Sequence, residues 1–172
     1  MNMPAPLLEP LFRTAAFERA DGRITARFGL TLENHVDEVW AALTDPAKLV
    51  DWLAPGEIDA RPGGAVKLNF VDSGIVIDST ISDIDPFRVL EFSWSGPGEP
   101  LRPVRFALEP VGSCAGLVLT LSVPEGEEAG RAAAGWAAHL EMLAAALAGV
   151  PIKFPFEVFK AARDEYRARL AD

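Results

Sequence analysis

A histidine in the middle of an apolar helix is the residue of this chain best suited to chemistry. His139 lies in GWAAHLEMLAAALAG, residues 135–149, whose other positions are mostly alanine and leucine. An imidazole at such a position can act as a general base, orient a ligand through one hydrogen bond, or be satisfied inside a core. A base also needs an orienting partner and a substrate proton within reach. The neighbouring sequence supplies no such partner, so all three roles stay open at this point.

The remaining reactive groups form no recognised catalytic, metal-binding or phosphate-binding pattern. The two histidines and the single cysteine are scattered, and no spacing matches a zinc site. The chain has no Gly-x-Ser-x-Gly elbow and no glycine loop leading from a strand into a helix. Cys114 lies in VGSCAG, an expected hairpin turn without the cationic neighbours that activate a thiol. We therefore predict no catalytic residue, no metal and no cofactor from the motifs.

Three aspartates would do acid–base work only if the fold buried them together. Asp83 and Asp85 precede Pro86, where aspartate side chains commonly bond their own backbone in a turn. Asp78 alternates with isoleucine along an expected strand, so its side chain should face solvent. Ordinary turn and surface roles are the interpretation that these patterns favour.

Composition and charge narrow the class of protein. A chain of 172 residues, 49% hydrophobic and 24% charged, fits one globular domain with a sizeable core. Its 25 acidic and 16 basic residues give a net charge of −9, which argues against nucleic acid and anionic membrane surfaces as partners.

The opening MNMPAPLLEPLFR lacks the pattern of a signal peptide. No apolar run approaches the about 20 residues that span a bilayer. With a single cysteine, these features predict a cytoplasmic protein.

The first elements are a hairpin and two short helices. Asp21-Gly22 is a turn signal that predicts a hairpin over residues 16–32, with apolar residues at every second position after the turn. NHVDEVWAALTDP then changes to helical spacing, and Asn34 is the expected cap. Asp45 followed by proline opens a second short helix, which should end near residue 52.

Further strands and a long helix complete the expected fold. Alternating apolar residues mark strands near residues 66–70, 75–81, 90–94, 104–108 and 117–123. Short turns between successive strands imply an antiparallel sheet. A helix over about residues 129–148 carries an apolar stripe, and an amphipathic helical tail follows over residues 151–172. The tail should pack on the domain or on a second copy, because its apolar face would otherwise lie in water.

Four stretches in this order resemble a known family. They are VWAALTDPAKLVDWLAP (39–55), RPGG (61–64), DIDPFRVLEFSW (83–94) and GWAAHLEMLAAALAG (135–149). The chain resembles the START-like, or SRPBCC, superfamily, in the branch similar to the activator of the heat-shock chaperone ATPase. Val66 departs from that pattern, since relatives often have an aromatic residue after the double glycine. The superfamily has no shared catalytic set, so no catalytic residue is carried over.

The resemblance implies an α+β helix-grip fold. A curved antiparallel sheet would wrap around a long C-terminal helix, with two short helices after the first long strand and a cavity between helix and sheet. Residues 1–150 would form a single START-like domain with an N-terminal extension, and residues 151–172 the amphipathic tail. Members of the superfamily bind, carry or transform apolar small molecules in this cavity.

The expected ligand-binding residues are inner-face aromatics and their helical neighbours. Trp52 should lie at the cavity mouth, and His139 should point into the cavity and touch ligand or water without a carboxylate behind it. The alternative for many of these aromatics is plain core packing. The full set is Trp52, Phe70, Phe92, Trp94, Phe106, Trp136, His139 and Leu140.

Three functions from different classes compete. The first is binding of a hydrophobic, aromatic or polycyclic small molecule, or of a lipid. The second is an enzyme in the same cavity, of cyclase, hydratase or hydrolase type, with His139 helped by Asn69 or Ser93. The third is activation of a chaperone ATPase through the protein surface. Whether the chain is an enzyme stays open.

The expected partners follow from these functions. A hydrophobic small molecule is the main one, and we expect no nucleic acid and no membrane insertion. The tail offers a route to a homodimer, and a protein partner also stays open.

Overall fold

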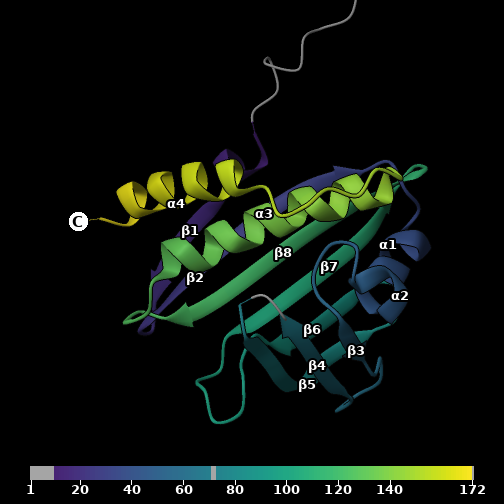
Figure 1. Cartoon of the computed structure of the whole chain (residues 1–172), viewed down its shortest axis with the longest axis horizontal. Helices are drawn as coiled ribbons and strands as arrows, with labels where there is room; N and C mark the ends of the chain where they lie inside the picture. The colour runs from purple at the N-terminus through teal and green to yellow at the C-terminus, as the bar shows by residue number, and fades with distance from the viewer. Residues whose placement is uncertain (1–9, 71–72, 172) are drawn as a thin grey trace, which may run out of the picture.

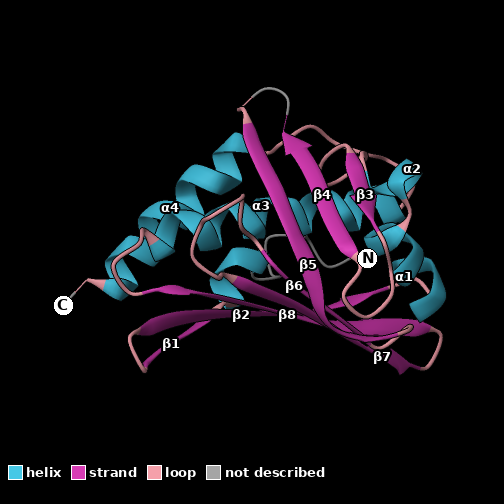
Figure 2. Ribbon diagram, turned by 90° about the horizontal axis from the view of Figure 1, so that it is seen from below, coloured by secondary structure: helices cyan, strands magenta, loops and turns pink. Residues whose placement is uncertain are grey.

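The computed structural model describes residues 10–70 and 73–171, so the first nine residues of the expected N-terminal extension, and residue 172 of the tail, lie outside it. Eight strands form one antiparallel sheet in the order β1-β2-β8-β7-β6-β5-β4-β3. The sheet curves around the long helix α3, and the short helices α1 and α2 cover one end (Figures 1 and 2). The predicted α+β helix-grip fold is confirmed.

The N-terminal hairpin forms as its turn signal predicts. β1 (Ala16–Ala20) pairs with β2 (Arg23–Leu32), and the two turn residues Asp21 and Gly22 have φ of 56° and 72°. Both values lie in the left-handed region that a two-residue hairpin turn requires. β2 then pairs along its whole length with the last strand, β8, so the beginning and end of the domain are joined.

The short helices begin at caps, one of which differs from expectation. α1 (Val36–Thr44) begins after His35, whose backbone N–H donates to the Glu38 carboxylate at 3.3 Å. Asn34 does not cap α1; its amide instead donates to the carbonyl of Leu147 at 3.2 Å and so joins α1 to the end of α3. The expected cap of α2 (Pro46–Leu49) is confirmed, since the Asp45 carboxylate accepts from the Ala47 N–H.

The remaining strands follow one another as neighbours. The edge strand β3 was not expected from the sequence, and β5 carries a register shift between Ile81 and Asp83. The bounds are β3 (Gly56–Ile58), β4 (Ala65–Phe70), β5 (Ile75–Asp85), β6 (Val89–Ser93), β7 (Pro103–Val111) and β8 (Cys114–Pro124).

α3 (Ala129–Leu147) lies across the concave face of the sheet. Ala133 and Ala137 are fully buried, and such small side chains let the helix backbone approach the strands closely. Trp136, Leu140 and Leu143 are also buried and extend toward the sheet as the apolar stripe predicts. None of the helices within the described residues is long and apolar enough to cross a membrane.

The chain turns back over α3 after its last residue. Gly149 has φ of 83°, and the Val150 N–H donates to the carbonyl of Ala145, which ends the helix in a left-handed turn. We call residues 149–155 the connector; it runs along α3 toward α4 (Phe156–Leu170), as Figure 1 shows.

α4 packs on α3 and on the short 3-10 helix η2 (Leu11–Thr14). Ala162 and Tyr166 are fully buried there, and the Tyr166 hydroxyl donates to the carbonyl of Phe12. A homodimer through this segment stays a prediction.

Candidate ligand-binding site

Aromatic side chains from the sheet and from α3 form one cluster between the two layers. Trp94 and Trp136 are the tightest pair, with ring centroids 4.7 Å apart. Phe106 lies 5.9 Å from Trp136, and Phe70 lies 5.7 Å from Trp94. The aromatic cluster comprises Trp52, Phe70, Phe92, Trp94, Phe106 and Trp136.

The residues expected to wall an open cavity therefore pack against one another. Phe92, Phe106 and Trp136 are 3% exposed or less, and Leu140 beside them is fully buried. A hollow of about 330 Å³, bounded by α1, α2 and the end of α3, reaches the cluster only at Trp52, and another of about 220 Å³ lies on β4 and β5. The described side chains thus bring the predicted residues together in a closed arrangement.

Trp52 lines the hollow of about 330 Å³, and its indole is buried. It is 1% exposed, and its indole N–H donates to the carbonyl of Ala42 at 2.7 Å. Its ring meets Phe106 edge-on, on the inner side of the aromatic cluster. The indole is buried together with its backbone acceptor, as a buried tryptophan N–H requires.

The backbone of Trp52 holds His139. The Nδ1 atom of His139 lies 2.9 Å from the carbonyl oxygen of Trp52. Because a carbonyl only accepts, Nδ1 carries the proton and Nε2 of the neutral ring is left as an acceptor. Burial lowers the pKa of His139 below its usual value, and the bond to Trp52 only partly offsets this. The imidazole is therefore neutral at physiological pH, without a carboxylate as hydrogen-bond partner.

Nε2 of His139 is not fully buried. It makes no hydrogen bond within the described residues, where every fully buried side-chain polar atom has a partner. Nε2 is consequently an unused acceptor at the surface of an otherwise apolar group of rings. The expectation that no carboxylate stands behind His139 agrees with this geometry; the partner of Nδ1 is a backbone carbonyl.

Three aromatic rings surround the imidazole. Phe70 and Trp136 lie 5.8 and 5.9 Å from it, and Phe154 of the connector lies 5.4 Å from it. Sequence reasoning missed Phe154. The signal that was available is Phe-Pro-Phe at residues 154–156, where large apolar side chains follow directly on the end of the long helix.

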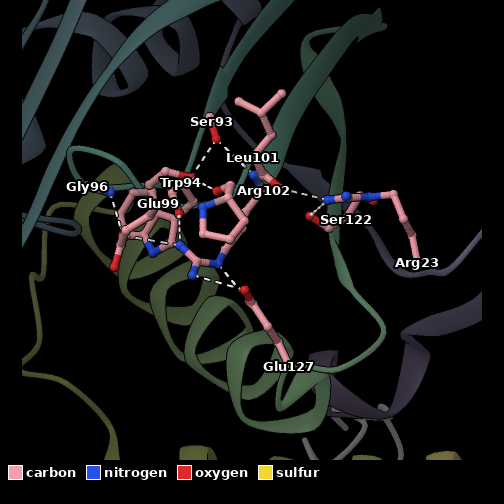
Figure 3. A network of polar contacts seen from close by, with 11 residues as sticks. Arg23, Ser93, Trp94, Gly96, Glu99, Leu101, Arg102, Ser122 and Glu127 are labelled. Atoms are coloured by element: carbon pink, nitrogen blue, oxygen red, sulfur yellow. Dashed lines mark hydrogen bonds and ion pairs between the residues drawn. The ribbon is translucent and has the colours of Figure 1, made fainter.

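A polar network fixes the loop after Trp94 to the start of α3 (Figure 3). The Arg102 guanidinium bonds both carboxylate oxygens of Glu127, at 2.7 and 3.1 Å, and also reaches the carbonyl of Trp94. The bonds to Glu127 raise the pKa of Arg102. Ser93 accepts from the Arg102 backbone N–H, so this serine has a structural role next to the aromatic cluster.

The other candidate groups lie apart from this site. Asp78 and Asn69 are exposed. Asp83 pairs with Arg105 at 2.9 Å and Asp85 pairs with an arginine of its own turn, so the two carboxylates form no acid–base pair. Within residues 10–70 and 73–171, no three His, Cys, Asp or Glu side chains gather as a metal site would require.

Comparisons with known proteins relate the chain to one family. The sequence profile described as "Activator of Hsp90 ATPase homolog 1-like protein" matches residues 34–148, about two thirds of the chain. This range runs from the start of α1 to the end of α3 and includes the whole aromatic cluster. No curated protein sequence matches the chain significantly.

Several solved structures share the fold. A protein encoded by BPP1335 from Bordetella parapertussis is 31% identical, with a TM-score of 0.71, over 92% of this chain and 93% of that one. CalU16 from Micromonospora echinospora is 25% identical, with a TM-score of 0.72, over 91% and 99% of the two chains. DynU16, described as a putative protein in the dynemicin biosynthetic locus, is 28% identical, with a TM-score of 0.65, over 77% of this chain and 49% of that one.

Proposed function

The chain belongs to the family of activator of Hsp90 ATPase homolog 1-like proteins, with the SRPBCC fold, and on that basis we propose that it binds an aromatic small molecule between α3 and the sheet. The ligand would lie against the aromatic cluster and donate one hydrogen bond to Nε2 of His139. A fused-ring phenol has this chemistry. The similarity to DynU16, from a biosynthetic locus, agrees with a small organic molecule as ligand.

One observation carries the proposal: a neutral imidazole with an unused acceptor lies among aromatic rings. The bond from Nδ1 to the carbonyl of Trp52 gives the imidazole a structural role, and Nε2 is the polar atom of the ring that this role leaves unused. Nδ1 is already bonded to Trp52, so the ring orientation and the proton position are fixed before a ligand arrives. Such a preset acceptor within an apolar surface is typical of a group that orients a ligand.

Apolar contact would provide most of the affinity. The aromatic cluster contains both edge-on pairs, such as Trp94 and Trp136 at 70°, and a stacked pair, Phe92 and Phe106 at 28°, so it presents both ring faces and ring edges. Each Å² of apolar ligand surface that leaves water contributes about 25 cal/mol. The single hydrogen bond to Nε2 adds about 1 kcal/mol, so it determines the orientation of the ligand more than its affinity.

The two rival functions have less support from the geometry. An enzyme that uses His139 as base would gain from a carboxylate behind Nδ1, and the partner there is a backbone carbonyl. Activation of a chaperone ATPase rests on the family description, and no surface feature of the described residues favours it.

The proposal is tested by comparing two ligands of the same shape. 2-Naphthol carries a hydroxyl donor, and 2-methylnaphthalene replaces it with a methyl group. Titration followed by tryptophan fluorescence should give about fivefold tighter binding of 2-naphthol, the equivalent of one neutral hydrogen bond. In His139→Phe this preference should disappear while both ligands still bind.

The matched control uses the other histidine. His35 is exposed at the start of α1, so His35→Phe should keep the preference for 2-naphthol. Absence of binding of either naphthalene to the wild-type protein, at concentrations up to their solubility, would contradict the proposed function.

A further inference from the structure

We propose that the protein occupies its own ligand site: the phenyl ring of Phe154 fills the ring position beside His139, and an aromatic ligand binds by displacing it. This inference rests on the proposed function and adds how access to the site is controlled. The ligand class it implies contains at least one flat six-membered aromatic ring.

The position of Phe154 is the first observation. Its ring meets the imidazole of His139 at 5.4 Å and 67°, an edge-to-face contact of the kind an aromatic ligand would make. Phe70 and Trp136, on β4 and α3, supply the neighbouring rings around the same imidazole. Phe154 is the only one of these three rings that is carried by a segment outside the helices and strands.

The connector that carries Phe154 is held by ring contacts and not by backbone hydrogen bonds: the Phe154 ring lies 5.0 Å from Phe156 and 5.7 Å from Phe159 on α4, besides its contact with His139. Within the described chain, residues 151–154 make no backbone hydrogen bond to any other segment. Ile152 is 44% exposed and Val150 is 63% exposed, so the connector contributes few apolar contacts besides the Phe154 ring. Moving this segment therefore breaks ring contacts but no regular structure.

Both ends of the connector are fixed independently. Gly149 closes the end of α3 through its left-handed conformation and the bond from Val150 to Ala145. α4 is anchored by the buried side chains of Ala162 and Tyr166. The connector can thus move Phe154 away from His139 while α3 and α4, which are fixed at its two ends, stay in place.

Displacement lowers the apparent affinity for the ligand. If the site is open in only a fraction of molecules, the measured dissociation constant rises by the inverse of that fraction. Removing the phenyl ring abolishes the competition, so Phe154→Ala should bind 2-naphthol about fivefold to tenfold more tightly than wild type. Phe154→Leu keeps an apolar side chain of intermediate size and should lie between the two.

The test is a titration of 2-naphthol into four forms of the full chain: wild type, Phe154→Ala, Phe154→Leu and the control Ile152→Ala. Ile152 lies on the same connector with its side chain largely in solvent, so its substitution should leave the affinity unchanged. Circular dichroism confirms that each variant keeps its helices. Tighter binding in the order wild type, Leu, Ala supports the inference.

Each other result has a distinct meaning. If both Phe154 variants bind 2-naphthol no more tightly than wild type does, Phe154 does not occupy the ligand site and the inference is overturned. Binding by the wild type would in that case still leave the proposed function intact. Binding by the variants but not by wild type would show that Phe154 fills the site and that 2-naphthol cannot displace it, which would contradict both the displacement and the proposed function. Absence of binding by all four forms would overturn both proposals.

A measurement without ligand separates the two proposals further. Acrylamide quenches tryptophan fluorescence only where it reaches the indole. Phe154 contacts His139, which lies 5.9 Å from Trp136, so Phe154→Ala should increase quenching at Trp136, which is 3% exposed with Phe154 in place. Unchanged quenching would count against the inference whatever the ligand titration shows.

Discussion

Replacing His139 by phenylalanine should make the stability of the protein less dependent on pH. The substitution keeps a ring among Phe70, Trp136 and Phe154 but removes the bond from Nδ1 to Trp52. The carbonyl of Trp52, in a residue 1% exposed, then loses its donor, which costs about 1–3 kcal/mol at pH 8.

The sign of the pH effect follows from the lowered pKa. Burial holds the pKa of His139 in the folded protein below the ordinary value of 6.5, so the unfolded chain binds more protons between the two values. The stability from the neutral imidazole is complete above pH 6.5 and is lost as the pH falls through the folded pKa. Between pH 6.5 and the pKa of His139 in the folded protein, the free energy of unfolding of wild type falls by up to about 1.4 kcal/mol per pH unit because of His139. The His139→Phe variant lacks this contribution.

Urea unfolding of both proteins at half-unit steps from pH 8 to pH 5 measures this difference. Titrations of carboxylates occur in both proteins and cancel when the two free energies of unfolding are subtracted. The gap between wild type and His139→Phe should be widest at pH 8 and should narrow below pH 6.5. A gap that stays constant, or that widens toward pH 5, would refute the assignment of a neutral buried imidazole.

Three further variants test the parts that position the site. Arg102→Ala removes the two-armed ion pair with Glu127 and should lower stability by about 1–2 kcal/mol, whereas Glu127→Gln, which keeps one acceptor, should cost less in the same thermal melts. Tyr166→Phe leaves the Phe12 carbonyl without its donor in a fully buried place, so unfolding in urea should show a loss of about 1–3 kcal/mol; an unchanged midpoint would show that the bond contributes nothing. Truncation after Val150 uncovers the face of α3 under α4 and should lower the melting temperature or change the mass in solution; if neither changes, the tail is a passive appendage.

The elements of the fold were largely predictable from the sequence because each has a local cause. Asp21-Gly22 requires left-handed backbone and so marks the first hairpin, and Asp45 with its following proline marks α2. The apolar stripe of α3 predicted the helix to within one residue of its observed end at Leu147. The edge strand β3 escaped prediction because three residues are too few to show a period.

The state of the site was not predictable, because it depends on contacts between distant residues. Alternation placed the aromatic side chains on inner faces, but only the assembled fold shows that they meet and close the space. His139 bonds the backbone of Trp52, 87 positions away, and periodicity contains no information about such a partner. Phe154 lies in a segment without period, so its place beside His139 depends on how the connector returns over α3.

The central claim, that an aromatic ligand binds between α3 and the sheet, is tested most directly by the four tryptophan indole N–H signals. A proton–nitrogen correlation spectrum recorded while 2-naphthol is added reports each indole separately. Trp94 and Trp136 belong to the aromatic cluster and should shift, whereas Trp40, which contacts Phe87 outside it, should stay in place. Shifts confined to Trp40, or no shift at any indole at saturating 2-naphthol, would contradict the account.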